Sequence, residues 1–125
     1  NIFDDEIKSW PLYFTPKILS SSNKKVFYIG DAFNGFLPSL AQGAGQSIES
    51  AYEIFNLLKE NKLDTDTYFK LRSKRAKIVR KRSNLNFFTF HLSNSLIQNI
   101  RNIILKFLVK RKKFIEGYLG KVYEN

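Results

Sequence analysis

A glycine and a carboxylate follow directly on a short apolar segment of the sequence. Residues 26–29 read Val-Phe-Tyr-Ile, and Gly30 and Asp31 come next. A short run of β-branched and aromatic residues is typical of a buried strand, so we expect one here, with Asp31 at its carboxyl end. In open α/β sheets, ligands bind beyond that end. Asp31 is therefore expected to accept hydrogen bonds from the hydroxyl groups of a ligand.

A second group of small residues, Gly43-Ala44-Gly45, opens the next predicted helix. The first N–H groups of a helix have no partner within the helix, and they lie at the positive end of its dipole. They can bind an anion or an electron-rich carbonyl group. The two groups together predict a site for a polyhydroxyl ligand with a negatively polarised end. An ordinary turn that Asp31 caps is the alternative reading of Gly30-Asp31 alone.

The elements that position these groups are expected from the apolar periodicity. Residues spaced three or four apart predict a helix that begins between Gly43 and Ser47 and ends near Lys59, after a loop over 31–42. An N-cap at Asp64 or Thr65 predicts a second helix over residues 66–81, ended by Ser83-Asn84. A third helix is expected over residues 95–110. Its apolar side chains are expected to point inward: Leu96, Ile97, Ile100, Ile103, Ile104, Phe107 and Leu108.

Residues 26–52 resemble the second FAD-binding motif of the class A flavoprotein aromatic monooxygenases, in their salicylate-hydroxylase-like branch. The matching residues are Gly30-Asp31-Ala32, Leu37-Pro38, Leu40-Ala41-Gln42-Gly43-Ala44-Gly45-Gln46, Ile48-Glu49 and Ala51. Three further stretches are similar in the same order, namely residues 10–13, the helix with Tyr68, Arg72 and Arg75, and the aromatic tail at 114–118. The sequence departs from the family at Phe33-Asn34-Gly35, where Ala-His-Pro is usual, and at Ser50, where aspartate is usual.

The resemblance implies an α/β fold. The chain would be the C-terminal fragment of a Rossmann-like FAD-binding domain of the para-hydroxybenzoate-hydroxylase type, itself mostly helical with one or two strands. We expect the remaining strands upstream, because one strand and three helices cannot complete a doubly wound sheet. Residues 1–60 would form the C-terminal part of the FAD-binding domain, and residues 61–125 a basic helical cap.

The resemblance also implies how the site would work. The Asp31 carboxylate, after Gly30, would contact the ribityl chain of FAD, and the Ala32 backbone would lie near the pyrophosphate. Pro38 would lie beside the isoalloxazine ring. The N–H groups of Gly43, Ala44 and Gly45 would face the flavin pyrimidine edge, where a helix N-terminus stabilises negative charge. No residue of the chain is assigned as catalytic, and no metal is expected.

The activity implied by the resemblance is hydroxylation of a small aromatic substrate with FAD, O₂ and either NADH or NADPH. The fragment alone is expected to be inactive and to bind FAD poorly, because the family holds the ADP half of FAD on an N-terminal βαβ unit. We expect a cytoplasmic protein that binds no nucleic acid. The sequence indicates nothing about its oligomeric state.

The charge of the chain is unevenly distributed. The net charge is +10, and residues 1–66 hold six Lys/Arg against nine Asp/Glu, whereas residues 67–125 hold fifteen against two. This asymmetry supports an alternative function, a basic helical module that binds nucleic acid or an anionic membrane surface. AT-rich codon usage is the competing explanation for the abundant lysine. Peripheral membrane contact through the basic half is compatible with the enzyme reading.

Two residue types limit the chemistry further. Cysteine is absent, which excludes disulfides and thiolate ligands within this sequence. The single histidine, His91, lies among Phe88 and Phe90, and we expect it to be packed or hydrogen-bonded rather than catalytic. Arg72 and Arg75 attract more interest, as candidates to pair with carboxylates elsewhere in the protein.

Overall fold

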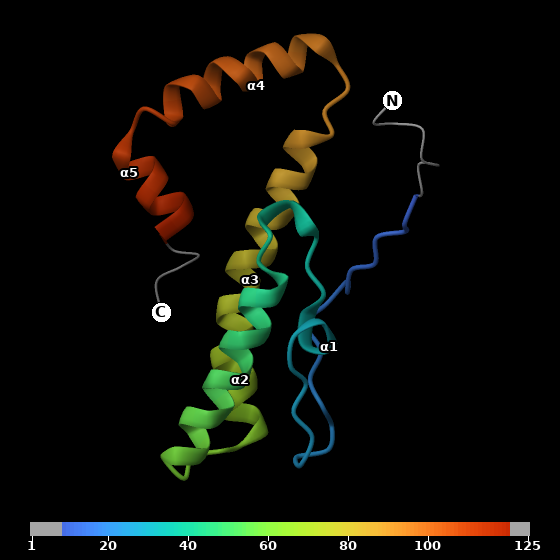
Figure 1. Cartoon of the computed structure of the whole chain (residues 1–125), viewed down its shortest axis with the longest axis vertical. Coiled ribbons are helices and arrows are strands. Elements are labelled where there is room, and N and C mark those ends of the chain that lie inside the picture. The colour runs from blue at the N-terminus through green and yellow to red at the C-terminus, as the bar shows by residue number, and fades with distance from the viewer. Residues whose placement is uncertain (1–8, 121–125) are drawn as a thin grey trace, which may run out of the picture.

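The computed structural model of the chain describes residues 9–120, without the side chain of residue 119. In chain order its elements are α1 (Asp31–Asn34), the 3₁₀ turn η1 (Pro38–Leu40), α2 (Gly43–Lys59), α3 (Thr65–Phe90), α4 (Ser95–Leu108), α5 (Lys112–Ile115) and the π turn η2 (Glu116–Gly120). Helices α2 and α3 lie side by side, and α4 and α5 form an arm that starts at the far end of α3 (Figure 1).

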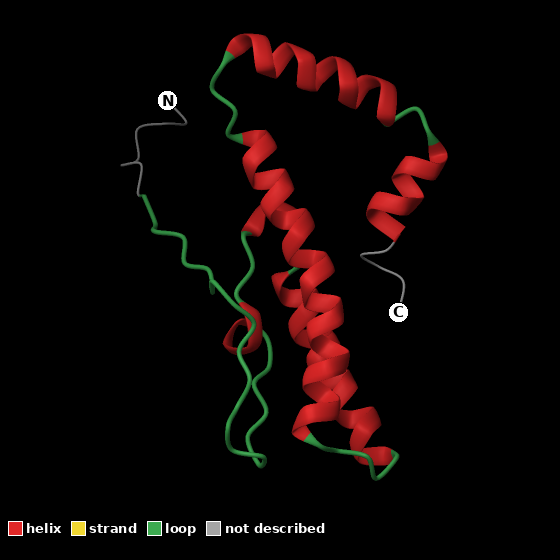
Figure 2. Cartoon of the chain, turned by 180° about the vertical axis from the view of Figure 1, so that it is seen from behind, coloured by secondary structure: helices red, strands yellow, loops and turns green. Residues whose placement is uncertain are grey.

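The predicted α/β fold is wrong. Residues 9–120 contain helices, turns and loops but no strand (Figure 2). Residues 26–29, the expected strand, lie in a loop with no neighbouring strand among the described residues, and a strand exists only where a neighbour supplies its ladder of hydrogen bonds. Here the carbonyl of Tyr28 accepts instead from the Tyr68 hydroxyl of α3, at 2.8 Å. The Phe27 ring packs edge-on against Tyr68, with the ring centroids 5.6 Å apart.

The core lies between α2, α3 and the loop that precedes them. Its buried members are Phe33, Leu57, Tyr68 and Ala76, with Ile18, Phe36, Ile54 and Phe69 packed against them. Burial of these side chains is the main favourable contribution to folding. The expected N-cap at Asp64 is confirmed, because its carboxylate accepts from the backbone N–H of Thr67 at 2.9 Å. Helix α2 has the predicted bounds.

Helix α3 is longer than the sequence predicts and holds most of the other segments. The predicted end at Ser83-Asn84 is wrong, because the helix continues to Phe90. Ser83 is fully buried, and its hydroxyl donates to the carbonyl of Leu37, just before η1. Asn86 donates to the carbonyl of Ser39 at 3.3 Å. Polar side chains that would favour a turn in isolation therefore bond to another element here, and the helix continues past them.

Two arginines of α3 hold segments distant in the sequence. Arg80 donates to the carbonyls of Thr15 and Pro16, at 2.6 and 3.1 Å, and fixes the extended N-terminal segment. Arg82 donates to the carbonyls of Gly117 and Tyr118 in η2. The Tyr118 hydroxyl is hydrogen-bonded to Asn86. The described part of the aromatic tail is thereby docked on α3.

The third predicted helix is confirmed as α4, which begins after an Asn94 cap that accepts from two backbone N–H groups. The prediction that its apolar side chains point inward is wrong. Leu108 is half-buried, but the other six are exposed and form what we call the apolar face: Leu96, Ile97, Ile100, Ile103, Ile104 and Phe107. Periodicity showed that the helix is amphipathic, but it could not show whether a neighbour covers the apolar side. None of the described helices is both long and apolar enough to cross a membrane.

Candidate functional site

The turn at Gly30 requires a glycine for two reasons. Its φ of 54° and ψ of −135° lie in a region that residues with a side chain rarely adopt. A Cβ atom at this position would also lie 2.6 Å from Oγ of Ser47 in α2, which is closer than real Cβ contacts. The missing side chain therefore lets the backbone that carries Asp31 lie directly against α2.

The contact with Ser47 lies one turn after the start of α2. The Ser47 hydroxyl donates to the carbonyl of Gly43 at 3.0 Å. Gln42, at the N-cap position, makes no side-chain capping bond. A Cβ built on Gly43 would meet nothing within 4 Å, and one built on Gly45 would meet only Oε1 of Gln42, at 3.6 Å. The start of α2 is thus uncapped by its N-cap side chain and open, with the positive end of the helix dipole accessible.

The structure brings the Gly30 turn against α2, near Gly43, Ala44 and Gly45, whereas Pro38 is positioned by a contact of the next residue with α3. Gly30 meets α2 at Ser47, next to the turn that holds Gly43, Ala44 and Gly45, and Asp31 follows Gly30 directly in the chain. Asp31 and Ala32 begin α1 and are exposed, as is Ala44. Pro38 is also exposed, at the first position of η1, and the following residue, Ser39, bonds to Ser83 of α3.

The residues at which the sequence departs from the family pattern belong to the core. Phe33 is 3% exposed and packs edge-on against Tyr68 and Phe69, with centroid distances of 5.8 and 6.0 Å. Asn34 is fully buried, and neither polar atom of its amide has a hydrogen-bond partner among the described residues. A larger aromatic side chain at position 33 therefore strengthens the attachment of α1 to α3.

A buried ionic cluster joins α2 to α3. The sequence singled out its two arginines as pairing candidates, but not their partners on α2. Arg72 is 5% exposed and donates to Oε2 of Glu49 at 3.1 Å and to Oε1 of Gln46 at 2.9 Å. Arg75 donates to the same Glu49 oxygen, also at 3.1 Å. Gln46 closes the cluster with a bond to Oε1 of Glu49 at 2.9 Å. Glu49 had a signal in the sequence, because it lies in the family-like segment and the arginines lie in the family-like helix.

The cluster changes the acidity of Glu49. Burial raises the pKa of this carboxyl, but hydrogen bonds and charges from Arg75 and Arg72 outweigh burial, so the pKa lies below its ordinary value of 4.5. Glu49 is therefore ionised at neutral pH. Since it lies little more than one turn after Gly45, the cluster fixes the direction of the open start of α2 relative to α3.

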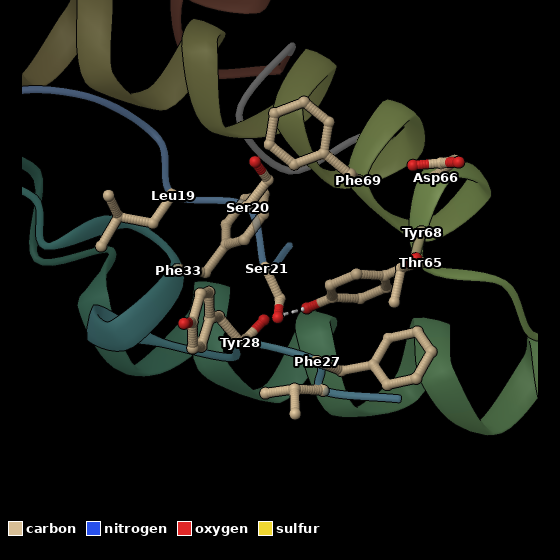
Figure 3. A pocket seen from close by; sticks show the side chains of 11 residues that line it. Leu19, Ser20, Ser21, Phe27, Tyr28, Phe33, Thr65, Asp66, Tyr68 and Phe69 are labelled. Carbon is tan, nitrogen blue, oxygen red and sulfur yellow. Dashed lines mark hydrogen bonds between the residues drawn. The ribbon is translucent and has the colours of Figure 1, made fainter. Parts of the chain in front are cut away.

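A hollow of about 240 Å³ lies at the other side of the residue 26–29 segment, between that segment and the first turn of α3 (Figure 3). It is lined mainly by apolar and aromatic side chains, including Leu19, Phe27, Tyr28, Phe33 and Phe69. In Figure 3 the Tyr68 hydroxyl points at the Tyr28 carbonyl. None of the seven predicted cofactor-contacting residues lines this hollow, so it is separate from the candidate site.

Comparison with known proteins gives a consistent set of names. The chain is 30% identical over 102 residues to a 3-amino-4-hydroxybenzoate 2-monooxygenase of Streptomyces platensis. The matched region covers 78% of this chain and 26% of that protein. The chain is similar to monooxygenases and hydroxylases. It is 36% identical over 56 residues to a salicylate hydroxylase of Pseudomonas putida, which covers 45% of this chain and 13% of the relative. A hispidin-3-hydroxylase of Neonothopanus nambi is 32% identical over 80 residues, 59% of this chain and 19% of its own length.

The chain therefore spans about a quarter or less of the curated relatives that it matches. No family model matches the chain, and no solved structure matches it. The relatives are named as monooxygenases and hydroxylases.

Proposed function

We propose that this chain is the part of a flavin-dependent aromatic monooxygenase that holds the ribityl and isoalloxazine side of FAD. The observation that carries the proposal is the contact of Gly30 with Ser47, which brings the Gly-Asp turn against the open first turns of α2. An exposed carboxylate directly after Gly30, together with an uncapped start of the helix that Gly30 meets, suits a ligand that combines hydroxyl groups with a negatively polarised ring edge. The similarity to monooxygenases and hydroxylases supports the same cofactor.

Each residue of the proposed site has a distinct task. Asp31 would accept hydrogen bonds from ribityl hydroxyl groups, and the Ala32 backbone would lie near the pyrophosphate. The N–H groups of Gly43, Ala44 and Gly45, with the dipole of α2 behind them, would stabilise negative charge at the pyrimidine edge. Pro38, whose ring is rigid and has no N–H group, would provide an apolar wall beside the flavin ring.

Bound FAD would supply the redox chemistry, the transfer of electrons from NADH or NADPH to O₂ with insertion of one oxygen atom into the substrate. The chain itself would orient the cofactor and help keep water from it. We propose a small, electron-rich aromatic substrate, because the relatives are named for hydroxybenzoate-type compounds, salicylate and hispidin.

The proposal is tested by comparing the Kd for FAD of the native protein with that of its Asp31→Asn variant. This variant keeps the size of the side chain and removes its charge. Because hydrogen bonds to a charged acceptor contribute about 1.5 to 3 kcal/mol, we expect the Kd for FAD to rise about 10- to 100-fold. Titration of the apoprotein with FAD, followed by flavin fluorescence, measures this change.

The matched control is Glu60→Gln, which removes an exposed carboxylate beyond the C-terminal end of α2. It should leave the Kd for FAD unchanged. Equal FAD affinity in the Asp31→Asn variant and the native protein would rule out the assigned role of Asp31.

A further inference from the structure

The apolar face of α4 is the largest exposed apolar feature of a single described helix. Leu96 is 72% exposed, Ile103 69% and Phe107 59%, and the other members of the face are between 48% and 58% exposed. The other side of the helix carries the polar residues Gln98, Asn99 and Asn102 and the cations Arg101 and Lys106, together with Leu105, which is 42% exposed. A helix with an apolar side of this extent needs a partner for it.

The polar side of α4 attaches the helix to the rest of the chain. Gln98 donates to the carbonyl of Leu92 at 2.6 Å, and Arg101 donates to the carbonyl of Thr89, at the end of α3, also at 2.6 Å. Both contacts use side chains outside the apolar face. In Figure 1, α4 extends away from the α2–α3 pair as an arm. The apolar face is therefore left uncovered by the described residues while the helix is held in place.

The charge next to the apolar face is mainly positive, with one carboxylate, that of Glu116, 3.6 Å from Nζ of Lys112. Four consecutive exposed cations follow α4 and form what we call the basic segment: Lys110, Arg111, Lys112 and Lys113. The sequence contains no acidic residue between Asp66 and Glu116. The Arg111 guanidinium lies over the Phe107 ring, 4.4 Å from its centroid, so cation and apolar face are continuous.

We propose that the apolar face and the basic segment dock on the surface of an anionic lipid bilayer. Helix α4 would lie in the plane of the interface, with its apolar side chains among the acyl chains. The basic segment would lie at the level of the lipid headgroups and interact with their negative charge. This surface is separate from the proposed flavin site and adds membrane attachment to the proposed oxidoreductase.

The composition of the surface favours a bilayer over two other partners. A second copy of the chain packed on the apolar face would offer the basic segment no negative charge from α4 in either orientation, because the sequence has no acidic residue between Asp66 and Glu116, and parallel packing would bring two basic segments together. Single-stranded nucleic acid binds by stacking its bases on aromatic side chains, whereas five of the six side chains of the apolar face are aliphatic. An anionic bilayer complements both the apolar side chains and the charge.

Co-sedimentation of the native protein with lipid vesicles tests the proposal. We expect binding to vesicles of phosphatidylcholine with phosphatidylglycerol, and binding to pure phosphatidylcholine vesicles that is weaker by about tenfold or more. Raising the salt concentration should weaken binding to the anionic vesicles. Equal binding to both vesicle types, or no binding to either, would overturn the proposal.

Two matched variants separate the apolar face from total charge. Ile100→Asp with Ile104→Asp changes the apolar face, and Asn99→Asp with Asn102→Asp makes the same change of net charge on the polar side of the same helix. All four positions are exposed, so neither variant removes a core contact. The isoleucine variant should bind anionic vesicles about tenfold or more weakly than the asparagine variant. Similar binding of the two variants would exclude the apolar face as the docking surface.

Further readouts distinguish the other outcomes. If the isoleucine variant lowers the mass of the protein in solution while the native protein does not bind vesicles, the face is an interface between copies and the proposal fails. If the native protein is retained on single-stranded DNA but not on anionic vesicles, the partner is nucleic acid and the proposal also fails. Flavin content should be the same in both variants, so loss of vesicle binding is distinguishable from failure of the FAD assignment.

Discussion

Single residues determine how the candidate site is assembled, and Gly30 is the clearest case. Its positive φ turns the chain at the end of the 26–29 segment, and its missing side chain allows the approach to Ser47. Since Asp31 follows directly, the position of the carboxylate depends on this turn. The Gly-Asp pair was recognisable in the sequence, but the need for glycine depends on a residue seventeen positions later, which no local pattern contains.

A Gly30→Ala substitution should therefore destabilise the protein by about 2 to 4 kcal/mol, from the strained φ and from the overlap with Ser47. Thermal unfolding measures the loss. In a Ser47→Ala background, which removes the Oγ atom, part of the loss should be recovered, while the strain in φ remains. Unchanged stability of Gly30→Ala in both backgrounds would contradict the described turn.

Glu49 is the second residue on which the site depends, and its ionisation predicts a pH dependence. Its pKa is lower in the folded protein than the ordinary 4.5, so the stabilisation is fully present above that pH and is lost as the pH falls through the folded-state pKa. A Glu49→Gln substitution should cost about 3 kcal/mol at neutral pH, because it leaves the buried Arg72 without its anionic partner.

Denaturant unfolding as a function of pH tests this prediction. The difference between the native protein and Glu49→Gln should shrink as the pH falls below 4.5, because Glu49 then becomes protonated. Glu60→Gln, which breaks an exposed pair with Lys62, is the control and should change stability little at any pH. A difference that is constant with pH would show that Glu49 is not ionised in the cluster.

At the scale of elements, the sequence predicted those features whose determinants lie within the element itself, and it failed where a feature depends on a neighbouring element. Helix α2 and the start of α3 were predicted because apolar spacing and the Asp64 cap lie within each helix. The strand at residues 26–29 was wrongly predicted, because a strand depends on a neighbour that a local run cannot reveal. The exposed apolar face of α4 was missed for the same reason, since a periodic pattern does not identify what covers it.

The length of α3 gives a prediction at this scale. Ser83→Ala should remove the bonds of the Ser83 hydroxyl to the Leu37 carbonyl and to the Ser39 hydroxyl, at a cost of about 1 to 3 kcal/mol, while the bond of Ser39 to the Ser83 carbonyl remains. Faster hydrogen exchange over η1, with α2 unchanged, is the expected signature. Ser73→Ala is the control, because Ser73 is also buried in α3 and its hydroxyl bonds, within the described part of the chain, to the Lys70 carbonyl of its own helix. Equal exchange at η1 in the two variants would contradict the described contact.

At the scale of the whole molecule, the two proposed functions lie in different parts of the chain. The proposed flavin site lies in the acidic first half, at Asp31 and the start of α2, whereas the proposed membrane surface lies at α4 and the basic segment. The expected division into residues 1–60 and 61–125 stays a prediction. The ion pairs of Glu49 with Arg72 and Arg75 cross that boundary and join the two parts.

Helix α3 is the element that positions most of the other described segments. Along its length Tyr68, Arg72, Arg80, Ser83 and Thr89 each contact a different segment: the residue 26–29 run, α2, the N-terminal stretch, η1 and α4. Inserting one residue into an α-helix rotates everything after it by about 100° and shifts it by about 1.5 Å. A single insertion near Ala76 would thus misalign the last three contacts at once, although every side chain involved would still be present. The spacing of the residues in α3 is therefore expected to be under tighter constraint than the identity of most of them.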